Sequence, residues 1–207
     1  MTQDYRAKNT RACSLEDNYL PYLYNRIARQ WELARGSGLL ALSLQKKIHI
    51  DAVLLSGTGT KERLYFVEHK FIFYHGNKPG KNVTIETLQN SYSDTPGWSI
   101  TTQADFILFA FEHTPEEKIL EVYLVPWRKL KVWFSEHGSL YRLYTDHKAP
   151  NAPEMRIIPI SHIERAITGT RRYIISENGL VVTDIQTSNK PTTGTIHTHI
   201  AVCSGVA

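Results

Sequence analysis

Cysteine is scarce in this sequence. Only Cys13 and Cys203 occur among the 207 residues, and they lack the close spacing of a zinc site. Two cysteines cannot form the disulfide framework of a small secreted fold. We therefore expect a protein of a reducing compartment.

Long hydrophobic runs are also missing. No stretch approaches the roughly 18 consecutive apolar residues of a membrane-spanning helix, and residues 1–18 have no apolar centre of the secretory type. The sequence therefore predicts no membrane association and a cytoplasmic location. Hydrophobic residues make up 42% and charged residues 21%, which excludes disorder throughout and fits a globule with a real core.

No large excess of one charge is present, since the net charge is +4. Residues 1–50 carry 8 basic and 4 acidic side chains, whereas residues 51–110 carry 5 basic and 6 acidic side chains. A polyanion-binding groove that leads to a carboxylate-lined site would have this distribution, and so would an ordinary surface. Both alternatives stay open on charge alone.

Two common catalytic motifs are absent. The segment Gly57-Thr-Gly59-Thr lacks the lysine of a phosphate-binding P-loop. The sequence also has no nucleophile elbow of the hydrolase type. Nucleotide hydrolysis on a P-loop and serine hydrolysis on such an elbow are therefore not indicated.

Apolar periodicity predicts a first helix over residues 15–34. Pro21 leaves two alternatives: the helix kinks there, or it begins near Leu20 with Pro21 in its first turn. A second helix opens at Pro126 and stops at Gly138. A shorter helix is predicted between a Ser161–Glu164 capping box and Gly169.

Strands are predicted where apolar and aromatic runs are bounded by turn residues. The longest run, residues 104–111, has the continuous apolar character of a strand covered on both faces. Helices and strands together predict an α/β or mixed α+β fold with a central mixed sheet flanked by helices. The predicted strands span residues 48–56, 63–71, 83–88, 104–111, 119–125, 139–145 and 155–160.

The segment Glu68-His-Lys70 is the most informative for chemistry. Side chains alternate along a strand, so Glu68 and Lys70 share one face. Asp51 begins the preceding predicted strand, and a short turn joins the two strands, which would place Asp51 beside Glu68. Two adjacent carboxylates raise each other's pKa unless a hard cation such as Mg²⁺ neutralises them. The residues alone leave open that Glu68 and Lys70 form an exposed surface pair and that Asp51 only ends a loop.

The spacing D51-(16 residues)-E68-x-K70 resembles the PD-(D/E)xK nuclease superfamily, which has the restriction-endonuclease-like fold. Flanking segments are similar to those of some phage and bacterial members: Gln45-Lys46-Lys47 before Ile50-Asp51, and Gly97-Trp98 followed by Thr102 and Ala104-Asp105-Phe106. The resemblance covers roughly residues 14–135. The family's proline is replaced by Ile50.

The resemblance implies a catalytic set of three residues. Asp51 and Glu68 would bind Mg²⁺ or Mn²⁺, and Lys70 would orient or activate the attacking water. The backbone carbonyl of His69 is implied as a further metal ligand. Glu16 on the first helix and Glu86 on the third strand are two more candidate ligands, although a solvent-exposed role for Glu16 stays open.

The implied activity is metal-dependent hydrolysis of DNA phosphodiester bonds in the cytoplasm of a bacterium or a phage-infected host. Lys46, Lys47 and Arg128 would contact the nucleic-acid backbone. RNA as substrate and a homodimer are further alternatives. Two other functions stay open: a non-catalytic nucleic-acid-binding or protein-interaction module on the same fold, and a structural protein. A single nuclease-like domain is predicted over residues 1–170, followed by an extension of uncertain structure over 171–207.

Overall fold

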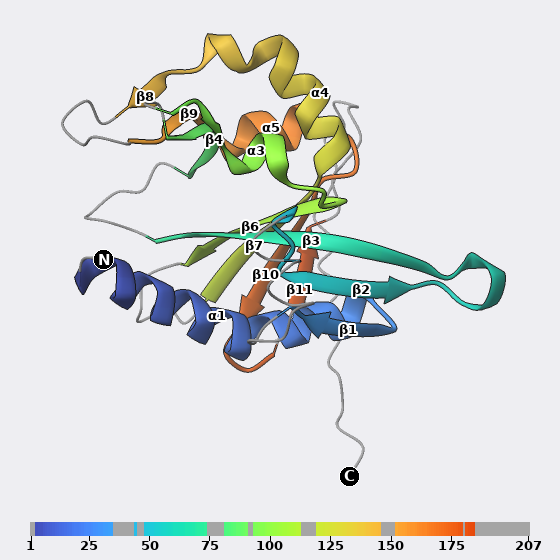
Figure 1. Ribbon diagram of the computed structural model, residues 1–207. Helices are drawn as coiled ribbons and strands as arrows, with labels where there is room; N and C mark the ends of the chain where they lie inside the picture. Colours follow the sequence, from blue (N-terminus) through green and yellow to red (C-terminus); the bar gives the residue numbers. More distant parts are fainter. Residues whose placement is uncertain are drawn as a thin grey trace, which may run out of the picture.

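The chain folds into three layers (Figure 1). A seven-stranded sheet lies in the middle, with the long helix α1 (Gln3–Ile27) across one face and a four-stranded sheet with shorter helices above the other. None of the described helices is long and apolar enough to cross a membrane. The computed structural model describes residues 3–34, 44, 48–73, 81–90, 93–112, 119–145, 152–179 and 181–184.

The central sheet is mixed. Its strand order is β1-β2-β3-β6-β7-β10-β11, and β3 and β6 run parallel while the other neighbouring pairs are antiparallel. The sequence prediction of a mixed α and β fold with helices beside a central mixed sheet is therefore confirmed. The strands are β1 (Gln30–Leu33), β2 (Ala52–Ser56), β3 (Arg63–Ile72), β6 (Phe106–Glu112), β7 (Ile119–Pro126), β10 (Arg171–Ser176) and β11 (Val181–Asp184).

The smaller sheet is antiparallel, with the order β5-β4-β9-β8. Three helices accompany it, and two short 3₁₀ turns complete the described elements. The strands are β4 (Asn82–Asn90), β5 (Thr95–Pro96), β8 (Leu143–Thr145) and β9 (Glu154–Pro159). The helices are α3 (Trp98–Thr101), α4 (Trp127–His137) and α5 (Ile160–Ala166), and the 3₁₀ turns are η1 (Gly59–Lys61) and η2 (Gly138–Leu140).

Two hydrophobic clusters hold the layers together. One joins α1 to the central sheet and includes Leu20, Tyr24 and Leu108. The other lies between the two sheets and includes Ile107 and Phe109. Residues 107–111 of β6 are buried, as the continuous apolar run predicts. Each large side chain so buried contributes about 1.5–3 kcal/mol.

The first helix differs from its predicted bounds. It runs from Gln3 to Ile27 with Pro21 inside it, and its last turn closes with the Ala28 amide donating to the Tyr24 carbonyl at 2.9 Å. Trp31, which the helical spacing included, belongs to β1 instead and packs against Tyr24 with ring centroids 5.7 Å apart. Trp31 and Leu33 are thus half-buried against the cluster under α1 as residues of a strand and not of the helix.

Two strands past residue 170 are absent from the prediction. β10 pairs with β7 along its whole length, and β11 pairs with β10. Tyr173 and Ile175 of β10 are buried in the cluster under α1, so alternation of apolar residues was the missed signal. The part of the predicted extension after Asp184 lies outside the described residues. The Ser161–Glu164 box does not open α5, because that helix begins at Ile160 with Pro159 as its N-cap.

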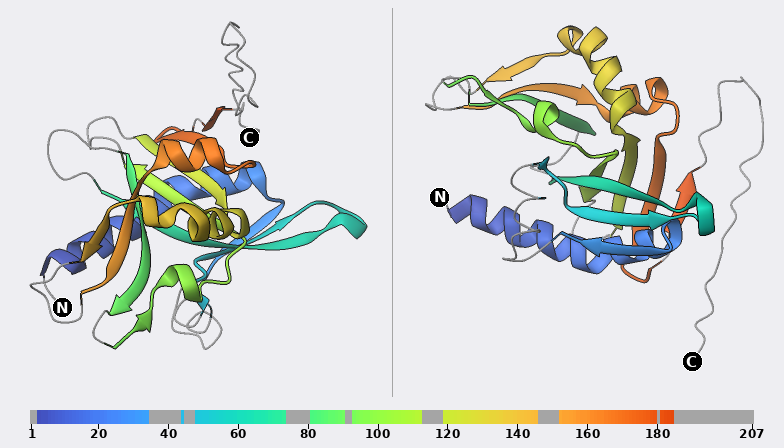
Figure 2. Two further views of the ribbon diagram at one scale, coloured as in Figure 1. Left: turned by 90° about the horizontal axis from the view of Figure 1, so that it is seen from above. Right: turned by 45° about the vertical axis from the view of Figure 1, so that its right-hand side comes forward.

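The β2–β3 hairpin projects beyond the body of the molecule (Figure 1, and Figure 2, left). Its tip, η1, contains no buried residue. The opposite end of β3 runs under the smaller sheet. Glu68 and Lys70 therefore lie in the half of β3 that is away from the hairpin tip, within the body of the molecule.

Candidate active site

Asp51 lies at an open edge of β3. β2 begins one residue later, at Ala52, whereas β3 continues to Ile72, so the register of the two strands stops at Val67. The Asp51 amide donates to the Val67 carbonyl at 2.8 Å, and Asp51 Oδ2 accepts a hydrogen bond from the His69 amide at 2.7 Å. The Asp51 carboxylate thus continues the strand pairing by one step and lies beside β3 in the plane of the sheet.

Glu68 and Lys70 share the face of β3 that looks toward the smaller sheet, as their spacing predicts. Lys70 Nζ lies 2.5 Å from Glu68 Oε1, and Glu68 is only 4% exposed. A cavity of about 510 Å³ opens here between the layers. Its lining brings Asp51, Glu68 and Lys70 together with Thr84 of β4 and Ala12 of α1.

Burial controls the protonation of Glu68. Loss of solvent raises its pKa from 4.5 to about 8, although the nearby Lys70 ammonium acts in the opposite direction. The Asp51 carboxylate contributes to this rise, by its charge and by a hydrogen bond between the two side chains. Without a cation, Glu68 therefore holds a proton at neutral pH.

The His69 backbone carbonyl faces the same edge as Asp51. Within a strand, the N–H and C=O groups of one residue point to the same side. Phe66, three residues earlier, shows this on the other side of β3: it donates its amide to Asp105 Oδ2 and accepts from the Asp105 amide, both at 2.8 Å. Since the His69 amide donates to Asp51, the His69 carbonyl is directed toward that edge as well.

The His69 side chain points to the opposite face, toward α1. Its Nδ1 lies 2.6 Å from Glu16 Oε1, and its Nε2 lies 2.5 Å from the Tyr24 hydroxyl. Because a carboxylate only accepts, Nδ1 carries a proton. Burial, together with the charges of Glu16 and Asp51, raises the pKa of Tyr24 and keeps its hydroxyl protonated. The structure therefore places Glu16, a predicted ligand, in a buried hydrogen-bonded chain beneath β3.

Glu86, the other additional candidate ligand, lies at the start of α3. Its Oε1 accepts a hydrogen bond from the Trp98 amide at 3.3 Å, and its backbone carbonyl accepts from Ser99 Oγ at 2.5 Å. Thr84, two residues earlier on the same face of β4, lines the cavity instead. In this arrangement Glu86 attaches α3 to β4.

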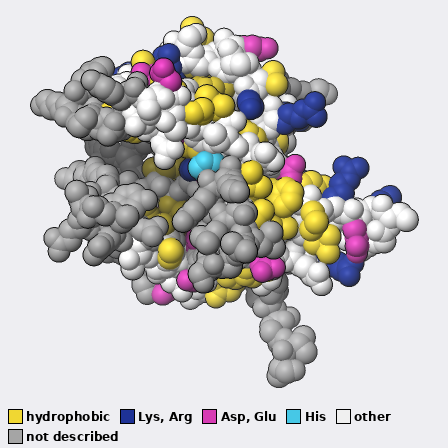
Figure 3. All heavy atoms as spheres, in the orientation of Figure 1, with side chains coloured by type: hydrophobic (Ala, Val, Ile, Leu, Met, Phe, Trp, Pro, Cys, Tyr) yellow, Lys and Arg dark blue, Asp and Glu magenta, His cyan; other side chains and the backbone are white. Residues whose placement is uncertain are grey.

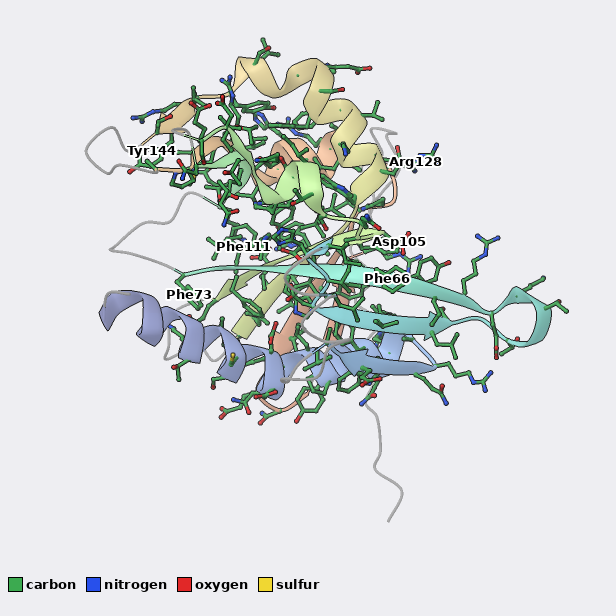
Figure 4. The ribbon with its side chains drawn as sticks, viewed as in Figure 1. Phe66, Phe73, Asp105, Phe111, Arg128 and Tyr144 are labelled. Carbon is green, nitrogen blue, oxygen red and sulfur yellow. The ribbon has the colours of Figure 1, made fainter. Side chains whose placement is uncertain are left out.

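The Thr-x-Ala-Asp segment supports the edge on which the site is built. Thr102 Oγ1 donates to the His49 carbonyl at 3.1 Å and so fixes the chain just before Asp51. Asp105 contacts Phe66 directly below it (Figure 4). Asp105 therefore fixes the backbone of β3 at Phe66, just before β6 begins.

Two side chains of the site were missed as site residues. His49 adopts a left-handed backbone with φ of 52°. Burial and the nearby Lys70 lower the pKa of His49, while Asp51 acts against them, so its ring belongs to the same electrostatic group. The ring of Trp98 lies against the ammonium group of Lys70. Figure 3 shows histidine and basic side-chain atoms together in the hollow between the layers.

The predicted nucleic-acid contacts are only partly placed. Lys46 and Lys47 lie outside the described residues. Arg128 is exposed near the start of α4 and points outward (Figure 4). Its neighbour Lys129 is used within the fold, since its Nζ donates to the Thr168 carbonyl at 2.7 Å.

The donor set of the edge matches a hard cation. Mg²⁺ in proteins takes one or two carboxylates, adds other oxygen ligands and keeps several waters. Asp51 and Glu68 supply the carboxylates, and the His69 carbonyl supplies a further oxygen. Among the described residues, no three His, Cys, Asp or Glu side chains are gathered into a metal-binding group.

Comparisons of the chain with protein-family models, with curated proteins and with solved structures find no match.

Proposed function

We propose that the chain is a metal-dependent nuclease of the PD-(D/E)xK type, with a restriction-endonuclease-like core, that hydrolyses DNA phosphodiester bonds. The observation that carries this proposal is the convergence of three side chains at the open edge of β3. Asp51 lies beside the strand, Glu68 is buried next to it, and Lys70 Nζ lies 2.5 Å from Glu68. The parallel pairing of β3 with β6 next to the antiparallel β2–β3 pair also supports it.

Asp51, Glu68 and the His69 carbonyl would hold Mg²⁺ or Mn²⁺. Such a cation supplies an acidified water and neutralises charge on a phosphodiester. Asp51 is oriented for this task because its Oδ2 is fixed by the His69 amide. Lys70 reaches the cavity with a positive charge that would orient the attacking water and stabilise negative charge on the phosphate.

The proton held by Glu68 supports the proposal that a cation binds here. Below a pH of about 8, Glu68 holds a proton because it is buried beside Asp51. A buried acidic pair is costly unless something positive lies between the carboxylates. Binding of a divalent cation would displace the proton that Glu68 holds, which couples metal binding to proton release.

DNA would approach through the cavity beside the end of β3, whose lining comes from both faces of the central sheet. Arg128 is one exposed cation on the layer above it, and Lys46 and Lys47 precede Asp51 in the sequence. These contacts would bind backbone phosphates without reading base sequence. Each phosphate contact contributes to a binding constant that falls with salt concentration.

Cleavage of circular and linear DNA with Mg²⁺ or Mn²⁺ tests the proposal. The native protein is compared with Glu68→Gln and Lys70→Met, and with Glu136→Gln and Lys131→Met, which change exposed residues of α4 as matched controls. We expect metal-dependent cleavage that both site variants lose and both controls keep. Cleavage of the circular substrate by the native protein would show that attack is internal.

Two results would contradict the proposal. Cleavage that survives in both site variants would mean that these residues do not catalyse it. Absence of cleavage, combined with Mn²⁺ binding and salt-dependent DNA binding that Arg128→Ala weakens, would instead indicate a non-catalytic nucleic-acid-binding module on the same fold.

A further inference from the structure

The ammonium group of Lys70 lies between side chains from the two sheets. Glu68 Oε1 of the central sheet is 2.5 Å from Lys70 Nζ. On another side, the centroid of the Trp98 ring lies 4.6 Å from the same nitrogen. This distance is within the roughly 6 Å over which a cation is attracted to the face of an aromatic ring.

Trp98 is held firmly in this position. It is the first residue of α3, and its amide donates to Glu86 Oε1 while the next residue, Ser99, donates its hydroxyl to the Glu86 carbonyl. Only 7% of Trp98 is exposed, and its ring packs against Trp127 at 5.5 Å. The ring therefore cannot turn away from Lys70 unless α3 leaves β4.

An aromatic partner solves a conflict that a charged partner would create. Glu68 is the carboxyl group that contacts Lys70, yet the proposed function assigns Glu68 to a divalent cation. A further carboxylate beside Lys70 would compete for that cation, whereas the face of an indole ring attracts an ammonium group and binds Mg²⁺ poorly because it offers no oxygen. It also limits the side-chain freedom of a long lysine, which otherwise costs up to about 2 kcal/mol to fix.

We propose that Trp98 is a positioning residue for Lys70, and that the smaller sheet, through α3, sets the place of the catalytic ammonium group. This inference rests on the proposed function, because that function gives Lys70 its catalytic role. Trp98 acts through Lys70 and does not itself touch the reacting atoms.

The kinetic test compares Trp98→Phe, which keeps an aromatic face, with Trp98→Leu, which keeps only an apolar side chain. A cation–π contact of about 0.5–2 kcal/mol corresponds to a fall in kcat of about 2- to 30-fold. We expect this fall in Trp98→Leu at unchanged KM, and a rate within about 3-fold of native in Trp98→Phe. Trp98→Met replaces Trp98→Leu if the latter does not fold.

Two controls separate positioning from packing. Trp133→Leu removes a tryptophan that stacks on His137 of α4, outside the cavity lining, and we expect native kcat from it. In a Lys70→Met background, Trp98→Leu should cause no further loss of rate, since its partner is already gone. Equal losses in both backgrounds would show that Trp98 only packs and would overturn the proposal.

A spectroscopic measurement tests the contact without DNA or metal. In ¹³C-lysine-labelled protein, the ε-methylene protons of Lys70 should resonate upfield of the other lysines because of the Trp98 ring current, with Lys70→Met assigning the signal. Trp98→Leu should abolish this shift and Trp133→Leu should keep it. An ordinary lysine resonance in the native protein would overturn the proposal. A clear shift in a protein that cleaves no DNA with any metal would instead overturn the nuclease function, and with it the catalytic role of the contact.

Discussion

Asp51 Oδ2 accepts the amide hydrogen of His69 at 2.7 Å, so a carboxylate proposed to bind metal also completes the pairing of β3 where β2 has ended. One side chain thus has a structural and a chemical task. The two tasks use different properties of the group, since the hydrogen bond needs an acceptor and the cation needs a charge.

Substitutions of Asp51 should separate these tasks. Asp51→Asn keeps an acceptor for the His69 amide, whereas Asp51→Ala leaves that amide without one, which costs about 1–3 kcal/mol. We expect both variants to lose cleavage, but only Asp51→Ala to lose stability to that extent in urea unfolding. Equal stability of the two variants would contradict the structural task.

The protonation of Glu68 should make the metal-free protein less stable as the pH rises. Its folded pKa of about 8 lies above the ordinary 4.5, so the native state holds the proton more tightly than the unfolded state. The resulting stability is complete below pH 4.5 and is lost progressively up to about pH 8. Urea unfolding in a chelator at several pH values measures it.

Glu68→Gln provides the control for this effect. The variant cannot titrate at this position, so its stability should lack the fall between about pH 5 and pH 8 that the native protein shows, an effect on the order of a few kcal/mol. Added Mg²⁺ should stabilise the native protein more at pH 8 than at pH 6, because it competes with the proton. Parallel pH profiles for the native protein and the variant would show that another group is responsible.

The hydrogen bonds that link Glu16, His69 and Tyr24 should be important for the stability of the fold. His69→Phe leaves the buried Tyr24 hydroxyl without its hydrogen-bond partner and removes one partner of the Glu16 carboxylate, and we expect a loss of about 2–4 kcal/mol. Tyr24→Phe removes only one hydrogen bond and should cost about 1 kcal/mol. Denaturant unfolding of both variants checks this order, and a milder effect for His69→Phe than for Tyr24→Phe would contradict it.

Gly97 should tolerate no side chain. A Cβ atom at this position would lie 2.5 Å from the Glu86 carbonyl oxygen, a backbone atom that cannot move aside. Gly97→Ala should therefore push α3 away from β4 and lower stability by about 1–3 kcal/mol. Cleavage should fall as well, because Trp98 follows directly. A native melting temperature and rate in Gly97→Ala would show that α3 can shift without consequence.

The sequence predicted the elements whose signals are local. The apolar run of β6, the aromatic run of β3 and the helix between Pro126 and Gly138 all appear close to their expected bounds. The approach of Asp51 to Glu68 also followed from sequence, because a short turn joins their two strands and strand side chains alternate.

Other features depend on packing between distant segments and had no local signal. Trp31 continues a helical spacing by coincidence, and only its pairing in β1 decides its structure. The roles of Glu86 and Trp98 require the smaller sheet to lie over the central one. The left-handed backbone of His49 likewise follows from the fixed positions of the segments around it.

The smaller sheet is composed of two separate stretches of the chain, since β4 lies between β3 and β6, and β9 lies between β7 and β10. Asn82 pairs with Pro159, so this sheet cannot form until the chain has been synthesised past that point. Contacts so distant in sequence slow folding and make it all-or-none rather than stepwise. A chain emerging from the ribosome would therefore contain Asp51 and Glu68 early, whereas the sheet that supports Trp98 could close only after Pro159 has been synthesised.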